Sequence, residues 1–182
     1  MRPQPEGHQG EPSTVELWVR SLGHPSVFQA QRDLSDRLHR LEASDIVDQA
    51  EVEVWGREVV LSGATARTEP GRRFMNRLGR FREWAERNDA TLEPCFEFST
   101  TSSEFTGEEY TVVDLPVCAL AEFDGDELVH VAPCTVGERV RTVEDRLSRL
   151  ESGYDLDGPL EADHPEDVID QLVPGTASGG RQ

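Results

Sequence analysis

The residues between 115 and 150 restrict the possible folds of this chain more than any other stretch. Two runs rich in apolar and β-branched residues, 117–123 and 128–132, flank the sequence Asp124-Gly125-Asp126. Asp-Gly between such runs is typical of a β-hairpin, because the tight turn requires a positive φ. The first run is apolar at both sets of alternate positions, so we expect it to lie in a sheet covered on both faces.

An amphipathic helix is expected to follow this hairpin. Thr135 and Gly137 precede it, it begins at about Glu138, and Gly153 is its expected C-terminal cap. Its apolar side chains recur at helical spacing, at Val140, Val143, Leu147 and Leu150.

The rest of the chain alternates strand-like and helix-like patterns. We expect strands at 14–22, 50–55 and 92–98, with 59–61 extending the second or forming a short partner, helices at 25–43 and 70–88, a loop at 62–70, a polar loop or hairpin tip at 99–109, and a strand or extended lead-in at 110–113. The apolar side of the first helix holds Phe28, Gln31, Leu34, Leu38 and Leu41, and the apolar stripe of the second holds Phe74, Leu78, Phe81 and Ala85. The order β-α-β-α-β-β-β-α predicts an α/β domain with about three helices covering a central mixed sheet. This single domain is expected to span 13–152, between a disordered tail at 1–12 and an acidic disordered tail at 153–182.

The charge of the chain predicts the solvent in which it works. The net charge is -18, and all 18 basic residues are arginine. A lysine-free, acidic surface favours a halophilic protein, because hydrated carboxylates keep it soluble while salt screens their repulsion. The alternative is an acidic protein from a GC-rich genome. In a halophile, overall acidity does not exclude nucleic-acid binding.

The apolar runs are too short for a membrane span, which needs about 18 residues. The first residues, MRPQPEGHQGEPS, lack the apolar core of a signal peptide. We therefore expect a cytoplasmic protein with reduced cysteines.

The second long helix carries the most informative surface. Residues 67–87 contain seven arginines and three glutamates, a net charge of +4 in an acidic chain. A stripe beside the buried face is predicted for Arg73, Arg77, Arg80, Trp84 and Arg87. Such a stripe could grip phosphates, stack on bases or hold an acidic partner, including the chain's own acidic tail. Alternatively, the arginines lie over apolar surface and pair with the protein's own carboxylates.

The cysteines offer a second candidate site. Cys118 and Cys134 lie on opposite arms of the expected hairpin, and His130 is predicted to share a strand face with Cys134. Cys118 and Cys134 could form a redox pair, and together with Cys95 and His130 they could form a metal site. The paired CxxC or HxxxH spacing of zinc sites is missing, however. The alternative is that the thiols are small apolar core side chains. No nucleophile motif, phosphate-binding loop or dinucleotide fingerprint occurs, so neither catalysis nor a cofactor is expected.

The order of elements resembles the thioredoxin fold, in which a hairpin and a terminal helix follow a βαβαβ start. The resemblance covers about residues 14–151 and includes Leu115-Pro116, where thioredoxins place a cis proline. The redox CxxC expected after the first strand is replaced by Ser21-Leu22-Gly23-His24, so the resemblance does not imply redox activity.

A second resemblance is to uncharacterised haloarchaeal proteins that carry an automatic helix-turn-helix label. The segments that carry it are VELWVRSL, VEVWGREV, ARTEPGRRF, FREWAERNDATLEPCFE, LPVCALAEF and HVAPC. The label implies DNA binding. In this sequence, however, each of the first two long helices is followed by a strand-like run instead of a short turn and a second helix.

These observations predict a non-catalytic binding or regulatory module. Its arginine stripe would engage an anionic macromolecule or a protein partner, and transcription is one such role. The alternative is a thioredoxin-like redox or metal-linked protein that uses Cys118 and Cys134. The sequence leaves the partner and the oligomeric state open.

Overall fold

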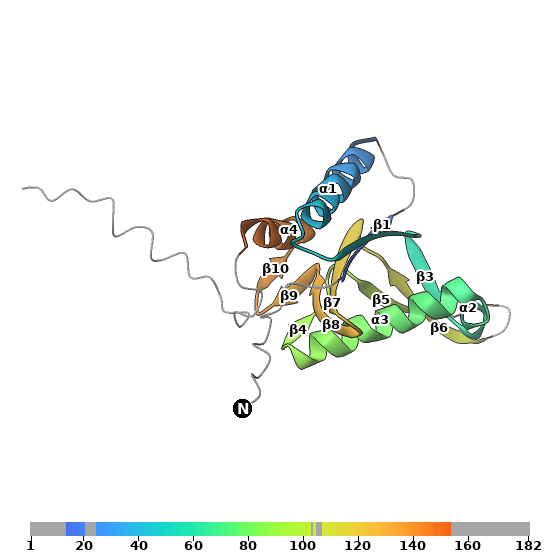
Figure 1. Ribbon diagram of the computed structural model, residues 1–182. Coiled ribbons are helices and arrows are strands. Elements are labelled where there is room, and N and C mark those ends of the chain that lie inside the picture. Colours follow the sequence, from blue (N-terminus) through green and yellow to red (C-terminus); the bar gives the residue numbers. More distant parts are fainter. Residues whose placement is uncertain (1–13, 21–24, 103, 105–106, 154–182) are drawn as a thin grey trace, which may run out of the picture.

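The protein is described here by a computed structural model, whose helices and strands are shown in Figure 1. It describes residues 14–20, 25–102, 104 and 107–153. The expected N-terminal tail and all but the first residue of the expected C-terminal tail lie outside these residues. Within the described part there are four helices and ten strands, which confirms the mixed α/β class.

A four-stranded sheet forms the centre of the fold. It contains β1 (Thr14–Arg20), β2 (Gln49–Trp55), β7 (Cys118–Asp124) and β8 (Glu127–Ala132). The order is β2-β1-β7-β8, with β1 parallel to β2 and antiparallel to β7. The predicted hairpin is confirmed as β7 and β8, and Gly125 makes the turn with a φ of 57°.

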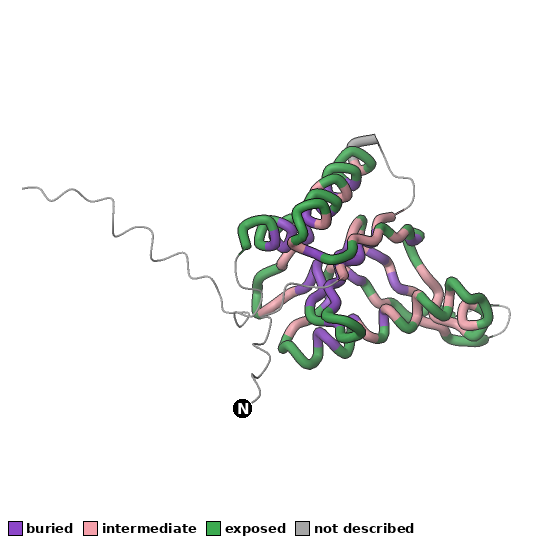
Figure 2. The backbone as a smooth tube through the Cα atoms, in the orientation of Figure 1, coloured by how far each residue is buried: buried purple, intermediate pink, exposed green. Residues whose placement is uncertain are grey.

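Helices cover both faces of this sheet, as the apolar pattern of 117–123 predicts. α1 (Pro25–Ala43) and α4 (Val143–Ser152) lie on one face and α3 (Glu69–Arg87) on the other (Figure 1). The first layer is built from Val15, Leu17, Leu34, Leu38, Leu120 and Leu147. The second is built from Trp18, Leu78, Phe81, Ala119, Ala121 and Phe123. Figure 2 shows buried segments in the strands of this sheet and along parts of the helices. Each large apolar side chain stabilises the fold by about 1.5–3 kcal/mol when buried.

The apolar side of α1 departs from the prediction at Phe28. Leu34, Leu38 and Leu41 are buried as expected, but Phe28 is 53% exposed. Between them, the buried Gln31 side chain donates to the carbonyl oxygens of Arg20 and Val117. Gln31 thus marks the point where α1 passes the ends of the strands, and Phe28 lies one turn beyond it.

Two smaller sheets flank the centre. One has the order β3-β6-β5, from β3 (Glu58–Leu61), β6 (Glu109–Asp114) and β5 (Glu97–Ser102). The other has the order β10-β9-β4, from β10 (Arg139–Arg141), β9 (Cys134–Val136) and β4 (Ala90–Thr91). The predicted element order is therefore too simple, because it has five strands in one central sheet, whereas the described residues form ten strands in three sheets.

The strand expected at 92–98 begins only with β5 at residue 97, and β5 continues to residue 102, into the expected loop or hairpin tip. Residues 92–96 turn between β4 and β5, and the Phe96 N–H donates to the Leu92 carbonyl oxygen at 3.0 Å. Leu92 and Phe96 are nevertheless buried. Burial therefore explains the apolar pattern, but a turn and not a strand provides it.

The final helix begins later than expected. α4 starts at Val143, where Thr142 and Asp145 form a capping box, and it ends as predicted at Gly153, with a φ of 63°. The preceding residues form the β9–β10 hairpin, with Gly137 in its turn at a φ of 60°. Val140 fits the helical spacing, but it lies in β10 and is 40% exposed. The cap, and not the apolar spacing, sets the start of the helix.

The expected loop at 62–70 contains a short helix, α2 (Gly63–Ala66). The cis bonds among the described residues are Glu93–Pro94 and Ala132–Pro133. The expected correspondence of Leu115–Pro116 with a cis proline is therefore wrong.

Candidate nucleic-acid interface

α2 leads directly into α3 through Arg67 and Thr68. Ser62 caps α2 by accepting from the Thr65 N–H, and Thr68 caps α3 by accepting from the Gly71 N–H at 3.1 Å. Within the described part of the chain, this is the one place where a helix follows a helix without an intervening strand.

The junction is closed tightly against the first turn of α3. A Cβ added at Gly71 would overlap the Thr65 carbonyl oxygen and lie 2.6 Å from Thr68 Oγ1. Arg72 Nη1 donates to the Arg67 carbonyl oxygen at 3.1 Å and to the Ala66 carbonyl oxygen at 3.4 Å. Carbonyls at the end of α2 thereby gain a donor, which fixes α2 relative to α3.

Gly71→Ala is expected to lower the free energy of unfolding by about 1–3 kcal/mol, because the added methyl meets backbone atoms that cannot move aside. Gly79→Ala is the matched control, because nothing lies within 4 Å of a Cβ at that position of the same helix. It should stabilise the chain by about 0.5–1 kcal/mol. Urea unfolding of both variants measures the difference, and equal effects would contradict the close approach at Gly71.

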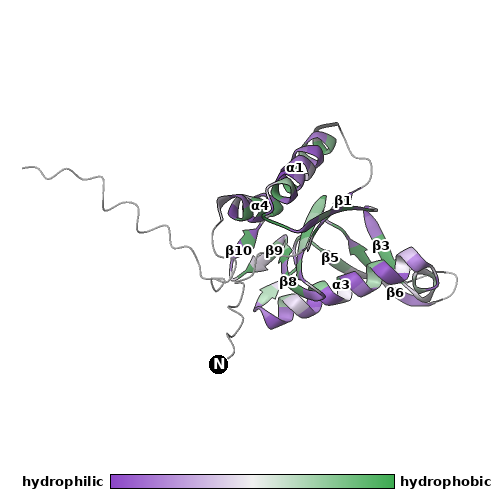
Figure 3. Ribbon diagram, in the orientation of Figure 1, coloured by the Kyte–Doolittle hydropathy of each residue, from purple (hydrophilic) through white to green (hydrophobic). Residues whose placement is uncertain are grey.

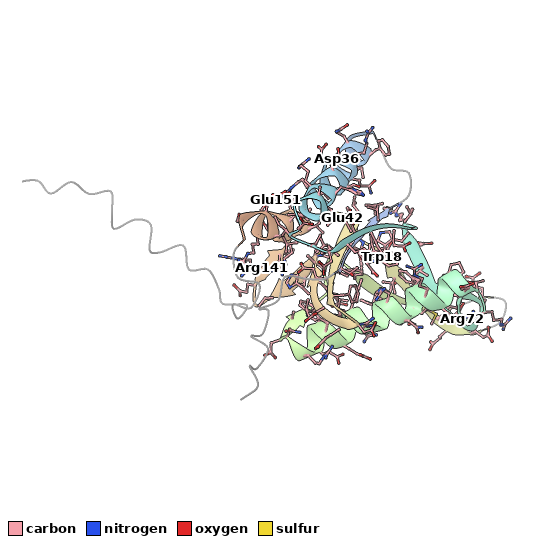
Figure 4. All side chains as sticks on the ribbon, viewed as in Figure 1. Trp18, Asp36, Glu42, Arg72, Arg141 and Glu151 are labelled. Carbon is pink, nitrogen blue, oxygen red and sulfur yellow. The ribbon has the colours of Figure 1, made fainter. Side chains whose placement is uncertain are left out.

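One face of α3 presents polar side chains to solvent. Glu69, Arg72, Arg73, Asn76, Arg77 and Arg80 line an open surface cavity of about 370 Å³. Four arginines and one glutamate line this cavity, and Glu53 and Glu16 of the sheet pair with two of these arginines. Figure 3 shows that hydrophilic residues recur along α3, and Figure 4 labels Arg72 at the end of the helix near α2. We call these six residues the arginine face.

Three of these arginines also contact the sheet. Arg73 Nη2 lies 2.6 Å from Glu53 Oε1, while Arg77 pairs with Glu16. Arg80 donates to the carbonyl oxygen of Asp126. The guanidinium carbons of Arg77 and Arg80 lie 4.5 and 5.1 Å from the centre of the Phe123 ring. The prediction that the arginines pair with the protein's own carboxylates therefore describes Arg73 and Arg77.

The Glu16–Arg77 pair is largely removed from water. Glu16 is 3% exposed, and its Oε2 accepts from Trp18 Nε1 at 3.0 Å. The pKa of the Glu16 carboxyl is raised, because the effect of burial is larger than the lowering by Arg77. The pKa of the Arg77 guanidinium is lowered, because the effect of burial is larger than the raising by Glu16. In both groups the loss of water outweighs the attraction. Arg77 is consequently held in place, whereas Arg72 is exposed.

The predicted stripe needs a correction at Trp84. Trp84 is 2% exposed, and its indole N–H donates to the Val129 carbonyl oxygen at 2.8 Å, so it belongs to the buried face of α3. Arg87 is exposed and donates back to the Glu83 carbonyl oxygen. The structure thus brings Arg73, Arg77 and Arg80 together and separates Trp84 and Arg87 from them.

The sequence prediction omits Arg72 and Asn76 from the site. A signal for them exists, because Arg72, Asn76 and Arg80 recur every four residues, which places them on one side of a helix. The predicted stripe misses this signal because it extends from Arg73 toward Trp84 and Arg87, along a different side of the helix.

The three cysteines are free. Cys118 packs against the layer under α1 and α4, whereas Cys134 lies in the layer under α3 and belongs to β9 instead of the hairpin. Burial raises the pKa of the Cys118 thiol to about 12 and that of the Cys134 thiol to about 11. Both thiols are therefore protonated at neutral pH, and the thiolate is the reactive form.

His130 is buried beside Trp84, with the two ring centres 5.1 Å apart in an edge-on arrangement. It lies opposite Glu122 in the hairpin, and Glu122 binds Arg146 through two hydrogen bonds of 2.5 and 2.7 Å. Burial, then Arg146, Arg149 and Arg141, holds the pKa of His130 well below its usual value. His130 is therefore neutral in the folded chain at neutral pH.

Stability is expected to fall as the pH drops below 6.5. In that window the unfolded chain protonates His130 while the folded chain does not, so the unfolded state binds more protons. The slope contributed by one such group approaches about 1.4 kcal/mol per pH unit. His130→Gln cannot take up this proton and should flatten the dependence of urea midpoints on pH. Parallel curves for the two proteins would exclude His130 as the source.

The described residues contain no group of three or more His, Cys, Asp or Glu that could hold a metal ion. Within the same part of the chain, no helix is long and apolar enough to cross a membrane.

Comparison with protein families gives a match over residues 7–155 to a model described as a helix-turn-helix domain. Comparison with curated proteins and with solved structures gives no match. The family match spans α1 to α4 and includes the α2–α3 junction. By this match over most of its length, the chain belongs to the helix-turn-helix domain family.

Proposed function

We propose that the protein is a non-catalytic regulatory module that binds duplex DNA through the arginine face of α3. The observation that carries this proposal is the open cavity lined by four arginines and Asn76 on one side of a helix that directly follows another helix. In helix-turn-helix proteins the second helix enters the major groove with its N-terminal residues against the bases. α3 would have this role, and the single-turn α2 would be an abbreviated first helix.

The chemistry of the arginine face suits a nucleic acid. Arginine binds phosphate or the O6 and N7 atoms of guanine through two hydrogen bonds, and asparagine reads adenine in the same way. Arg72, Arg73 and Asn76 lie in the first half of α3, where such contacts are made. The Arg73 side chain is 56% exposed, so its remaining N–H groups can reach a phosphate while it stays paired with Glu53.

A competing partner is an acidic protein, for which the same charges would serve. Capture of the tagged chain from its own cells in molar KCl, with and without nuclease, separates the two. We expect bound DNA fragments that are lost after nuclease and lost from an Arg72→Gln, Arg73→Gln variant. A partner protein that survives nuclease and depends on these arginines would contradict DNA binding.

We also propose that the central sheet and its helices form a thioredoxin-like arrangement into which the two smaller sheets are inserted. The strand order β2-β1-β7-β8, with α1 and α4 opposite α3, supports it. Residues 21–24, where a redox motif would stand, lie outside the described part of the chain. Distances in solution between labels on α1, α3 and α4 that place α3 on the same face as α1 would contradict this arrangement.

We further propose that the protein works in the salt-rich cytoplasm of a haloarchaeon, with 13–152 as its folded module. The net charge of -18 and the absence of lysine support this. The midpoint of thermal unfolding should rise steadily from low salt to molar KCl as carboxylate repulsion is screened. A midpoint that is highest in low salt would contradict it.

A further inference from the structure

β2 is an edge strand of the central sheet with exposed apolar side chains. β1 pairs with one side of it, and among the described residues no strand pairs with the other. Val52 and Val54 are 40% and 62% exposed. They alternate with residues that face α3, so they lie on the α1 side with Ala50, whose side chain packs in the layer under α1. The exposed Phe28 of α1 adds apolar surface on that side of the sheet.

The backbone of this edge is available for pairing. The Ala50 N–H donates to Glu42 Oε1 at 3.0 Å and therefore points away from β1. Alternate residues of a strand point their N–H and C=O groups to the same side. Val52 and Val54 consequently direct these groups outward, where a partner strand would lie. Glu42, labelled in Figure 4, occupies the edge at Ala50, whereas Val52 and Val54 further along β2 are exposed.

We propose that two copies of the chain form a dimer by antiparallel pairing of β2 with β2 around a two-fold axis at Glu53. In this register Val52 of each copy lies opposite Val54 of the other, so the four outward-facing valine backbones make hydrogen-bonded pairs. The same register brings the four valine side chains together on the α1 side. This pairing would join the two four-stranded sheets into one and would remove two exposed edges.

The charges at the axis are self-complementary in a pair of identical copies once Arg73 is included. Glu53 of one copy lies opposite Glu53 of the other, but each is already paired with its own Arg73. Because the Arg73 side chain is 56% exposed, each guanidinium can bridge both carboxylates. The like-charged pair at the axis therefore becomes a neutral cluster of two carboxylates and two guanidinium groups. The proposal does not depend on nucleic-acid binding.

Sedimentation analysis of the full chain in molar KCl tests the dimer, because that salt screens the repulsion between two acidic copies. We expect reversible dimer formation in the wild type and at least a tenfold weaker dimer in Val54→Glu. Val129→Glu is the matched control, because Val129 is 41% exposed on β8, the other edge of the same sheet, and this change should leave the dimer intact.

Cysteine cross-linking tests the register. In the proposed pairing, residue 53 faces its own copy in a non-hydrogen-bonded pair with Cβ atoms about 4.5–5.5 Å apart, so Glu53→Cys should form an intermolecular disulfide on mild oxidation. Glu51→Cys places the two thiols about 13 Å apart along the strands and should not. The wild type under the same oxidant gives the background from its own cysteines.

A dimer that is weakened by Val54→Glu and cross-linked at position 53 supports the proposal. A chain that stays monomeric throughout, a dimer that survives Val54→Glu, or cross-linking at position 51 as efficient as at 53 overturns it. A monomer that binds an extended peptide along this edge would also overturn it, since the occupant would then be another protein.

Discussion

Arg72→Gln combined with Arg73→Gln is expected to weaken the binding of duplex DNA at least about tenfold at a fixed KCl concentration. Both side chains line the cavity of the arginine face, and among the described residues no carboxylate contacts Arg72 that would hold it away from a phosphate. Each phosphate contact by an arginine releases counterions, so losing two such contacts lowers the affinity strongly. Glutamine retains a hydrogen-bond donor and much of the side-chain length while removing the charge.

The matched control is Arg32→Gln combined with Arg40→Gln. These two arginines are exposed on α1, on the other side of the sheet, and the change in net charge is identical. Fluorescence anisotropy with a labelled duplex measures both variants, and unfolding curves confirm that both remain folded. Equal losses in the two variants would show that overall charge, and not the arginine face, governs binding.

Arg146→Ala is expected to lower the free energy of unfolding by about 3–5 kcal/mol, the largest effect on stability foreseen for a single side chain. Arg146 is 7% exposed and binds Glu122, which is fully buried, through two hydrogen bonds. Truncation leaves the Glu122 carboxylate without its cation in the layer between β7 and α4. A loss of this size is a large part of the stability of a typical domain.

Arg149→Ala is the control for this change, because Arg149 lies on the same helix and is exposed. It should alter stability by no more than about 0.5 kcal/mol. Glu122→Leu combined with Arg146→Met removes both charges and should restore most of the stability lost in Arg146→Ala. Urea unfolding in molar KCl measures all three, and a double variant as unstable as Arg146→Ala would contradict the ion-pair explanation.

The central part of the fold follows from local sequence patterns. Asp124-Gly125 between two apolar runs predicts the β7–β8 hairpin, and the apolar residues on both sides of β7 predict a sheet covered twice. These patterns are reliable because the turn needs glycine and the burial needs apolar side chains at a period of two. The cores of α1 and α3 follow in the same way from apolar residues at helical spacing.

The smaller sheets could not be predicted in this way. β4 has two residues and pairs with β9, more than forty positions along the chain, so no local pattern specifies it. The apolar run at 92–98 is buried through a turn, and Val140 fits a helix that begins only after it. Apolar residues indicate burial, but they do not show whether the buried segment is a strand, a turn or the start of a helix. Helix caps and long-range strand pairing determine which of these forms.

The candidate site was predicted in part. The composition of 67–87 identifies the helix and three of its arginines, Arg73, Arg77 and Arg80. The placement of Trp84 failed because the sheet lies against a wider face of α3 than the predicted apolar stripe, and the indole fills that space beside His130. The buried Glu16 that holds Arg77 lies on β1, and only the tertiary structure brings it to α3.

The central claim, that the arginine face of α3 binds DNA, is tested most directly by the salt dependence of the affinity of the wild-type chain for duplex DNA. The three arginines Arg72, Arg73 and Arg80 can each take up a phosphate, which predicts a linear plot of log K against log salt with a slope of about −3. The Arg72→Gln, Arg73→Gln variant should reduce this slope to about −1. No measurable binding, or a slope near zero in the wild type, would contradict the account.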